Sequence, residues 1–124
     1  MKLFSVRGAV QLDKNNAANM ENHVTQLLTD LVETNGINET EIVHILFTQT
    51  KDLTRENPAR ALRKSGFQNV PLFCSLEPQY PRSLKRTVRV LVTYYHGTDH
   101  QPSPIYLNGA QILRTDLFPS DEVL

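Results

Sequence analysis

The sequence is poor in cysteine: Cys74 is the only one, so no disulfide can form within the chain. Together with the lack of a recognisable signal peptide, this predicts a cytoplasmic protein. The apolar runs are all far too short to span a bilayer, so we expect no membrane-spanning helix. The sequence also lacks a glycine-rich phosphate-binding loop, internal repeats and low-complexity stretches.

An excess charge of either sign is missing as well. Lysine and arginine total 13, and aspartate and glutamate total 13. A balanced charge argues against a nucleic-acid or membrane-surface partner. No pair of histidines or acids has the spacing of a metal site, and no nucleophile lies beside an evident base. The sequence therefore predicts neither a metal ion nor covalent catalysis, and we interpret Cys74 as a small packed residue.

The composition fits one ordinary globular domain. The chain has 124 residues, of which 40% are hydrophobic and 21% are charged. This is enough for a single domain with a real core. We assign residues 1–114 to that domain and residues 115–124 to a C-terminal tail that we expect to be mobile.

The segment 84–96 carries the strongest pattern in the chain. Val88, Val90, Val92 and Tyr94 alternate along it, which predicts a strand with this set on one face. Arg89 lies on the opposite face among apolar neighbours. An arginine keeps its charge, and burying it without a partner is costly, so an anion should meet it. Taken alone, the segment favours a protein carboxylate as that anion over a bound ligand.

Periodicity and capping residues predict the remaining elements. We expect strands over residues 2–10, 42–47, 69–77 and 105–114, and helices over residues 15–35 and 58–66. Gly8 would allow another backbone or a ligand to approach the first strand closely. The nearly unbroken apolar run 42–47 predicts a strand buried on both faces, with His44 as a satisfied core histidine.

The order of these elements predicts an α+β domain with a mixed sheet and helices on one face. The other face of the sheet would then lie uncovered. Apolar positions on that face need a partner, and oligomerisation would provide one.

The candidate functional residues are arginines on apolar elements. They are Arg7 and Arg89, with Arg63 and Arg114 as further candidates, together with Glu77 at a strand end and Tyr106 on the last strand. Arg7 taken alone reads as an exposed edge residue. The combination suits a small dianionic ligand better than covalent chemistry.

At this point the residues resemble a known family. The matching segments are Val6–Ala9, Asp52–Leu53, Pro58–Arg63, Val70–Glu77, Leu84–Arg86, Arg89–Val90, Tyr106–Leu107, Leu113–Arg114 and Asp116–Leu117. As an ordered set, they resemble the small monofunctional chorismate mutases of the trimeric α/β-barrel type. The resemblance implies a homotrimer with a pseudo-α/β barrel and active sites between adjacent subunits. It also implies conversion of chorismate to prephenate on the route to phenylalanine and tyrosine, without a cofactor.

The resemblance also assigns roles to residues. It places Arg7, Cys74, Glu77, Arg89 and Tyr106 at the ligand. Phe73, Ser75 and Leu76 would line the site through their segment, and Arg60, Arg63, Leu113 and Arg114 would be peripheral or interface contributors. Of these, Arg89, Glu77 and Arg7 would be catalytic. The sequence departs from the family at Asn57, where an aromatic residue is common, and at Arg60, where a lysine is common.

Two other functions stay open from the sequence. Imine deaminases use similar small trimeric barrels and bind a carboxylate with arginine, but they need a positioned water for which no motif is seen. The other alternative is a non-catalytic trimer that binds a small anion for regulation. It would be favoured if a protein carboxylate occupied Arg89.

Overall fold

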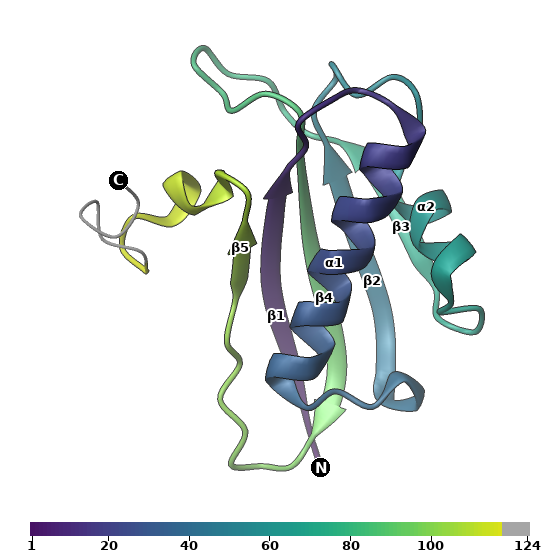
Figure 1. Ribbon diagram of the computed structural model, residues 1–124. Helices are drawn as coiled ribbons and strands as arrows, with labels where there is room; N and C mark the ends of the chain where they lie inside the picture. Colours follow the sequence, from purple (N-terminus) through teal and green to yellow (C-terminus); the bar gives the residue numbers. More distant parts are fainter. Residues whose placement is uncertain (118–124) are drawn as a thin grey trace.

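The computed structural model describes residues 1–117 and shows a five-stranded mixed sheet in the order β3-β2-β4-β1-β5 (Figure 1). The strands are β1 (Lys2–Gln11), β2 (Ile42–Gln49), β3 (Leu72–Leu76), β4 (Thr87–His96) and β5 (Ile105–Leu107). β4 runs antiparallel to both β1 and β2, whereas β3 is parallel to β2 and β5 is parallel to β1. The predicted α+β class, mixed sheet and order of elements are confirmed.

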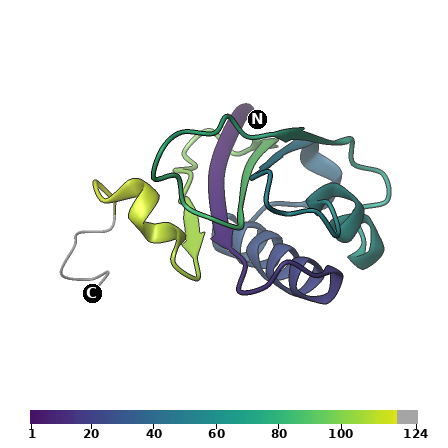
Figure 2. The ribbon, with the colours of Figure 1, turned by 90° about the horizontal axis from the view of Figure 1, so that it is seen from above.

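Two α-helices, α1 (Ala17–Asn35) and α2 (Pro58–Ser65), cover the same face of the sheet (Figure 2). α1 begins where the side chain of Asn16 accepts a hydrogen bond from the Asn19 amide, and it ends at Gly36 in the left-handed conformation. At α2, the Asn57 side chain accepts from the amide of Arg60. The predicted caps at Gly36 and Asn57 are confirmed.

The hydrophobic core lies between these helices and the sheet. Val88, Val90, Val92 and Tyr94 of β4 are all buried there, as their alternation predicts. Gly8 lies at a tight contact, because a Cβ atom at this position would be 2.9 Å from Leu31 Cδ1 and 3.0 Å from the carbonyl oxygen of Ile105. The predicted close approach of another backbone to Gly8 is therefore confirmed.

The opposite face of the sheet is uncovered in the single chain. Leu46 is 38% exposed and Phe73 is 64% exposed on neighbouring strands. The prediction that β2 is buried on both faces is therefore wrong for the single chain, and His44 is half-buried rather than a core residue. An apolar run predicts that both faces avoid water, but both helices cover the same face.

The predicted last strand is also wrong over most of its length. β5 ends at Leu107, because Asn108 and Gly109 both take positive φ angles, 53° and 100°. Two successive left-handed residues turn the extended chain into the short 3₁₀ helix η2 (Ala110–Arg114). Part of the predicted tail, residues 118–124, lies outside the described residues. No helix within residues 1–117 is long and apolar enough to cross a membrane.

Candidate active site

A pocket of about 580 Å³ opens on the uncovered face of the sheet, beside the loop between β3 and β4. Its polar lining comprises Arg7, Thr48, Glu77, Tyr80, Ser83, Arg89, Tyr106 and Arg114, and its apolar lining includes Leu46 and Leu91. The structure therefore brings Arg7, Glu77, Arg89 and Tyr106 together, although they come from widely separated segments of the sequence.

Strand register explains why the two arginines meet. In the antiparallel pair of β1 and β4, Arg7 is opposite Leu91, and Ala9 is opposite Arg89. Alternate residues of a strand point to the same face, so Arg7 and Arg89 are diagonal neighbours on the side away from the helices. Within residues 1–117, Arg7 has no ion-pair partner.

Glu77 links two strands at the floor of the pocket. Its Oε1 lies 2.8 Å from Nε of Arg89 and accepts a hydrogen bond of 2.7 Å from the Thr48 hydroxyl. Its backbone amide donates to the carbonyl of Gln49 at the end of β2. The protein carboxylate predicted for Arg89 thus exists. A guanidinium has five N–H donors, so this ion pair does not exhaust its capacity to bind an anion.

Tyr106 and Arg114 form a second wall of the pocket, carried by β5 and η2. Arg114 makes a bidentate ion pair with Asp116, with Nε–Oδ1 and Nη2–Oδ2 distances of 3.0 and 2.8 Å. This ion pair is the larger cause that raises the pKa of Arg114, and a hydrogen bond that Arg114 donates to the side chain of Tyr106 is the second. Arg114, predicted as a peripheral residue, therefore lines the pocket as a permanent cation.

Among residues 1–117, the lining of the pocket combines cations with one fixed carboxylate and includes neither histidine nor cysteine. Within the described part of the chain, no three histidine, cysteine or acidic side chains gather so that they could hold a metal ion. The arrangement can bind a dianionic ligand and stabilise negative charge that develops in it.

Comparison with known proteins assigns the chain to a family. The sequence model for chorismate mutase type I matches residues 3–117. The chain belongs to the chorismate mutase type I family. It is 35% identical over 114 residues to chorismate mutase AroH of Thermus thermophilus, covering 90% of this chain and 93% of the relative. It is 31% identical over 119 residues to the AroH protein of Bacillus subtilis strain 168, with 94% of each chain covered.

A solved structure supports the same assignment. The chorismate mutase from Clostridium thermocellum superposes with a TM-score of 0.80 at 35% sequence identity. The match covers 88% of this chain and 98% of the other one. The fold predicted from the resemblance to chorismate mutases is therefore confirmed at the level of the single chain.

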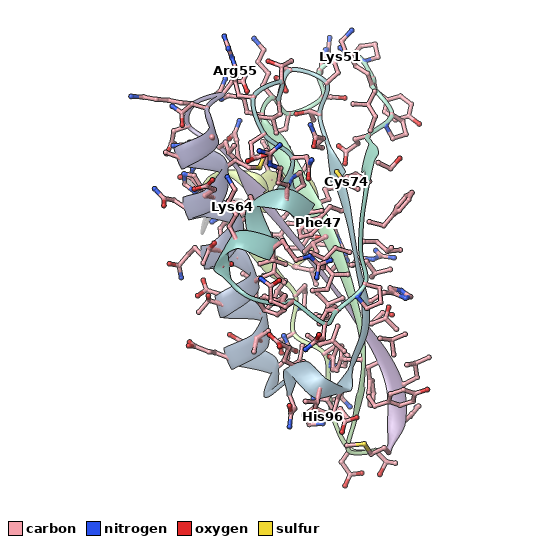
Figure 3. All side chains as sticks on the ribbon, turned by 90° about the vertical axis from the view of Figure 1, so that its right-hand side faces the viewer. Phe47, Lys51, Arg55, Lys64, Cys74 and His96 are labelled. Atoms are coloured by element: carbon pink, nitrogen blue, oxygen red, sulfur yellow. The ribbon has the colours of Figure 1, made fainter. Side chains whose placement is uncertain are left out.

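Several residues predicted for the site lie away from this pocket. Cys74 pairs with the core residue Phe47 and packs on the helix side of the sheet, where its thiol lies 3.4 Å from Gln49 Oε1 (Figure 3). Burial raises the pKa of the Cys74 thiol. Arg63 of α2 donates from Nη1 to three backbone carbonyls, those of Phe67, Gln68 and Val70.

These residues belong to a second group, at the β3 edge of the sheet and on α2. Arg60 and Arg63 line a separate surface depression of about 440 Å³ with Asn57 and Leu72. Along β3, Ser75 is exposed, and Phe73 and Leu76 are 64% and 61% exposed. Within a single chain, this second group does not meet the pocket that holds Arg7 and Arg89.

Sequence reasoning missed Thr48, which contacts Glu77 directly. The expected strand stopped at Phe47, one residue short of it. Extending the alternation from Leu46 would have placed Thr48 on the same face, but its pairing with Arg89 depends on strand register, which the sequence does not show.

Proposed function

We propose that this protein converts chorismate to prephenate in the pocket on the uncovered sheet face, with Arg89, Glu77 and Arg7 as the catalytic residues. The observation that carries the proposal is the convergence of Arg7, Arg89 and Arg114 on one pocket. Among residues 1–117, the only acid that lines this pocket is Glu77, which is itself paired with Arg89. Membership of the chorismate mutase type I family supports the reaction.

The reaction explains why this set of side chains is enough. The rearrangement is an intramolecular pericyclic shift, so it needs no nucleophile and no cofactor. The substrate carries two carboxylates and an ether oxygen, and breaking the ether bond builds negative charge on that oxygen. A fixed cation at this position stabilises the transition state more than the ground state. In our proposal Arg89 supplies this charge.

The other residues hold the substrate in its reactive shape. Arg7 and Tyr106 would bind a carboxylate and select the compact conformer. Glu77 would accept from the ring hydroxyl while it orients Arg89. Its Oε1 already accepts from Thr48 and Arg89, so Oε2 is the oxygen that we assign to the substrate.

We further propose that the working enzyme is a homotrimer in the cytoplasm, serving phenylalanine and tyrosine synthesis. Leu3, Leu46, Phe73 and Tyr95 are exposed apolar side chains on the sheet, and a neighbouring subunit would bury such a surface. The second group of residues on α2 and β3 would then complete the pocket of an adjacent subunit. In this arrangement Phe73, Cys74, Ser75, Leu76, Arg60 and Arg63 would reach the substrate across the interface.

One observation favours the alternative of a non-catalytic anion-binding trimer. Arg89 is already paired with Glu77 at 2.8 Å, which offsets part of its charge before any ligand arrives. The family match supports chorismate mutase over the imine-deaminase alternative.

A single assay separates turnover from binding. The purified protein is added to chorismate, the absorbance of chorismate is followed, and the product is identified as prephenate by nuclear magnetic resonance. We expect loss of chorismate with stoichiometric formation of prephenate. Binding of prephenate in a calorimeter without any turnover would instead establish the regulatory alternative.

A further inference from the structure

The wall of the pocket formed by Tyr106 and Arg114 depends on one short turn. Tyr106 belongs to β5, Arg114 ends η2, and Asn108 and Gly109 lie between these elements. β5 has three residues, lies at an edge of the sheet and, among residues 1–117, pairs with β1 alone. The conformation of this turn therefore decides where η2 and Arg114 lie relative to Arg7 on β1.

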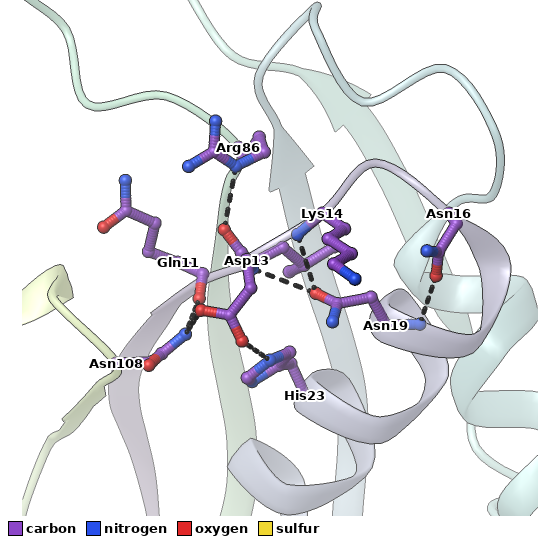
Figure 4. A network of polar contacts seen from close by, with 9 residues as sticks. Gln11, Asp13, Lys14, Asn16, Asn19, His23, Arg86 and Asn108 are labelled. Carbon is purple, nitrogen blue, oxygen red and sulfur yellow. Dashed lines mark hydrogen bonds and ion pairs between the residues drawn. The ribbon is translucent and has the colours of Figure 1, made fainter.

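The side chain of Asn108 fastens this turn to the end of β1. Its Nδ2 donates to the carbonyl oxygen of Gln11 at 2.6 Å and to Oδ1 of Asp13 at 3.0 Å (Figure 4). Asn108 has a φ of 53°, a left-handed conformation that asparagine tolerates better than most residues. A Cβ atom on Gly109 would lie 2.5 Å from Gln11 Oε1, so Gln11 packs closely against the turn.

Asp13 is itself held from the other side. Its Oδ2 lies 3.1 Å from Nε2 of His23 on α1, and its backbone amide donates to the side chain of Asn19 (Figure 4). The hydrogen bonds from Asn108 and then from His23 lower the pKa of Asp13. Asp13 is therefore a charged acceptor at neutral pH, and hydrogen bonds to charged groups are stronger than neutral ones.

We propose that Asn108 is a positioning residue for substrate binding, which acts by tethering the β5–η2 turn to Asp13 and Gln11 and so holds Tyr106 and Arg114 against Arg7. This deepens the proposed function and rests on it, because the wall is taken to hold a substrate carboxylate. Asp13 and His23 anchor the tether from outside the pocket. Apolar packing also supports the wall, through the small cluster of Ala9, Tyr106 and Ala110 and through Ile105 and Leu107, which pack against the main core.

The first test removes the amide and keeps the backbone conformation. Asn108→Gly permits a positive φ and loses both hydrogen bonds. We expect KM for chorismate to rise about tenfold, the scale of one hydrogen bond to a charged group, with kcat nearly unchanged. Asn108→Asp keeps the size of the side chain but faces Asp13 with a like charge, so it should raise KM further. An unchanged KM in both variants overturns the proposal.

Asn38→Gly is the matched control. Asn38 caps η1 (Glu39–Glu41) through hydrogen bonds to the amide and hydroxyl of Thr40, and it does not line the pocket. The Asn38→Gly variant loses the same side-chain amide as Asn108→Gly, but at a position away from the pocket. Its KM should therefore equal that of the unchanged protein. A rise in KM as large as that of Asn108→Gly would mean a general structural effect and would overturn the proposal.

A double-mutant cycle tests whether Asn108 acts through the wall. In an Arg114→Ala background, Asn108→Gly should raise KM much less than in the unchanged protein, because the group it positions is already gone. Fully additive effects would overturn the proposal.

A spectroscopic measurement keeps this inference separate from the proposed function. The Arg114 Nε–H group bonds to Asp116, and its ¹H–¹⁵N resonance reports on the position of η2. We expect this resonance to shift in Asn108→Gly and not in Asn38→Gly. An unshifted resonance overturns the positioning role even in an active enzyme. A shifted resonance in a protein that does not convert chorismate supports the tether, and only the proposed function then fails.

Discussion

Thr48 and Arg89 are cross-strand partners on β2 and β4, and both contact the same oxygen of Glu77, at 2.7 and 2.8 Å. The carboxylate is thus oriented by two strands of the rigid sheet. With its backbone amide also bonded to Gln49, Glu77 has little freedom to rotate. This relationship makes the floor of the pocket the best-defined part of the candidate site.

The charge of Arg89 can be tested apart from its shape. Citrulline at position 89, introduced by semisynthesis, keeps the planar group and removes the charge. If Arg89 stabilises the ether oxygen in the transition state, kcat should fall by about 10²–10³ or more, with a much smaller loss of affinity for prephenate. Kinetics, calorimetry and thermal unfolding are measured on the same sample. A folded variant with near-normal kcat would refute the mechanism, and a purely structural ion pair would lower stability instead.

Thr48→Val tests the hydroxyl that orients Glu77. Valine is nearly isosteric but cannot donate, so Glu77 Oε1 loses one of its two partners. We expect kcat/KM for chorismate to fall about tenfold, the scale of one hydrogen bond to a charged group. Thr48→Ser restores a hydroxyl and should recover most of the activity. An unchanged kcat/KM in Thr48→Val would contradict the orienting role of the hydroxyl, and a loss in Thr48→Ser alone would assign the effect to the methyl group.

Cys74→Ala should keep most of the activity. The thiol packs against the core, its pKa is raised by burial, and a neutral S–H group is a weak donor. The measurement is kcat/KM beside a thermal unfolding curve. Abolished turnover in a folded Cys74→Ala protein would bring covalent chemistry back into consideration.

The homotrimer predicts a definite mass in solution. Light scattering at micromolar concentration should give three times the 14.1 kDa of one chain. Phe73→Asp, which puts a charge on the exposed sheet face, should shift the protein towards monomer and lower activity. Asn22→Asp adds a charge on the exposed side of α1 and should leave the mass unchanged. A monomeric unchanged protein with full activity would remove the shared-pocket arrangement.

The stability of the folded protein should fall at acidic pH, because His100 becomes protonated. Desolvation is the main cause that lowers the pKa of His100 below 6.5. The second cause is repulsion from His96, whose ring centroid lies 3.9 Å from that of His100. Because the folded pKa is the lower one, the unfolded chain binds a proton first, and stability falls as pH drops below about 6.5. The melting temperature of His100→Gln should therefore fall less than that of the unchanged protein between about pH 7.5 and about pH 5.5. Parallel curves for the two proteins would contradict this.

The parts of the fold that follow local rules could be predicted from the sequence. The alternation at Val88, Val90, Val92 and Tyr94 identified β4 because side chains of a strand point to opposite faces in turn. Helix boundaries followed from Asn57 and Gly36, whose chemistry acts over a few residues. The last strand failed at Asn108, because the prediction followed the apolar residues on either side of Asn108 and Gly109 and passed over this dipeptide, which is a turn signal in the sequence itself.

The candidate site could be predicted where a charged side chain occurs in an otherwise apolar strand. Arg7 and Arg89 were found because arginine is out of place in an apolar strand. Thr48 is an ordinary strand residue, and only the register of β2 against β4 gives it a partner. The separation of Cys74 from Arg89 likewise depends on which face of the sheet the helices cover, a global property that a local pattern does not contain.

Gly8 shows that a residue can limit the enzyme without any chemistry of its own. A methyl group there would press on Leu31 of α1 and on the Ile105 carbonyl, so α1 or β5 would have to give way, and β5 carries Tyr106. The constraint on Gly8 arises on the helix side of the sheet, opposite the face that carries Arg7 and Arg89. The evolutionary freedom of this pocket is therefore restricted from the core as well as from the substrate.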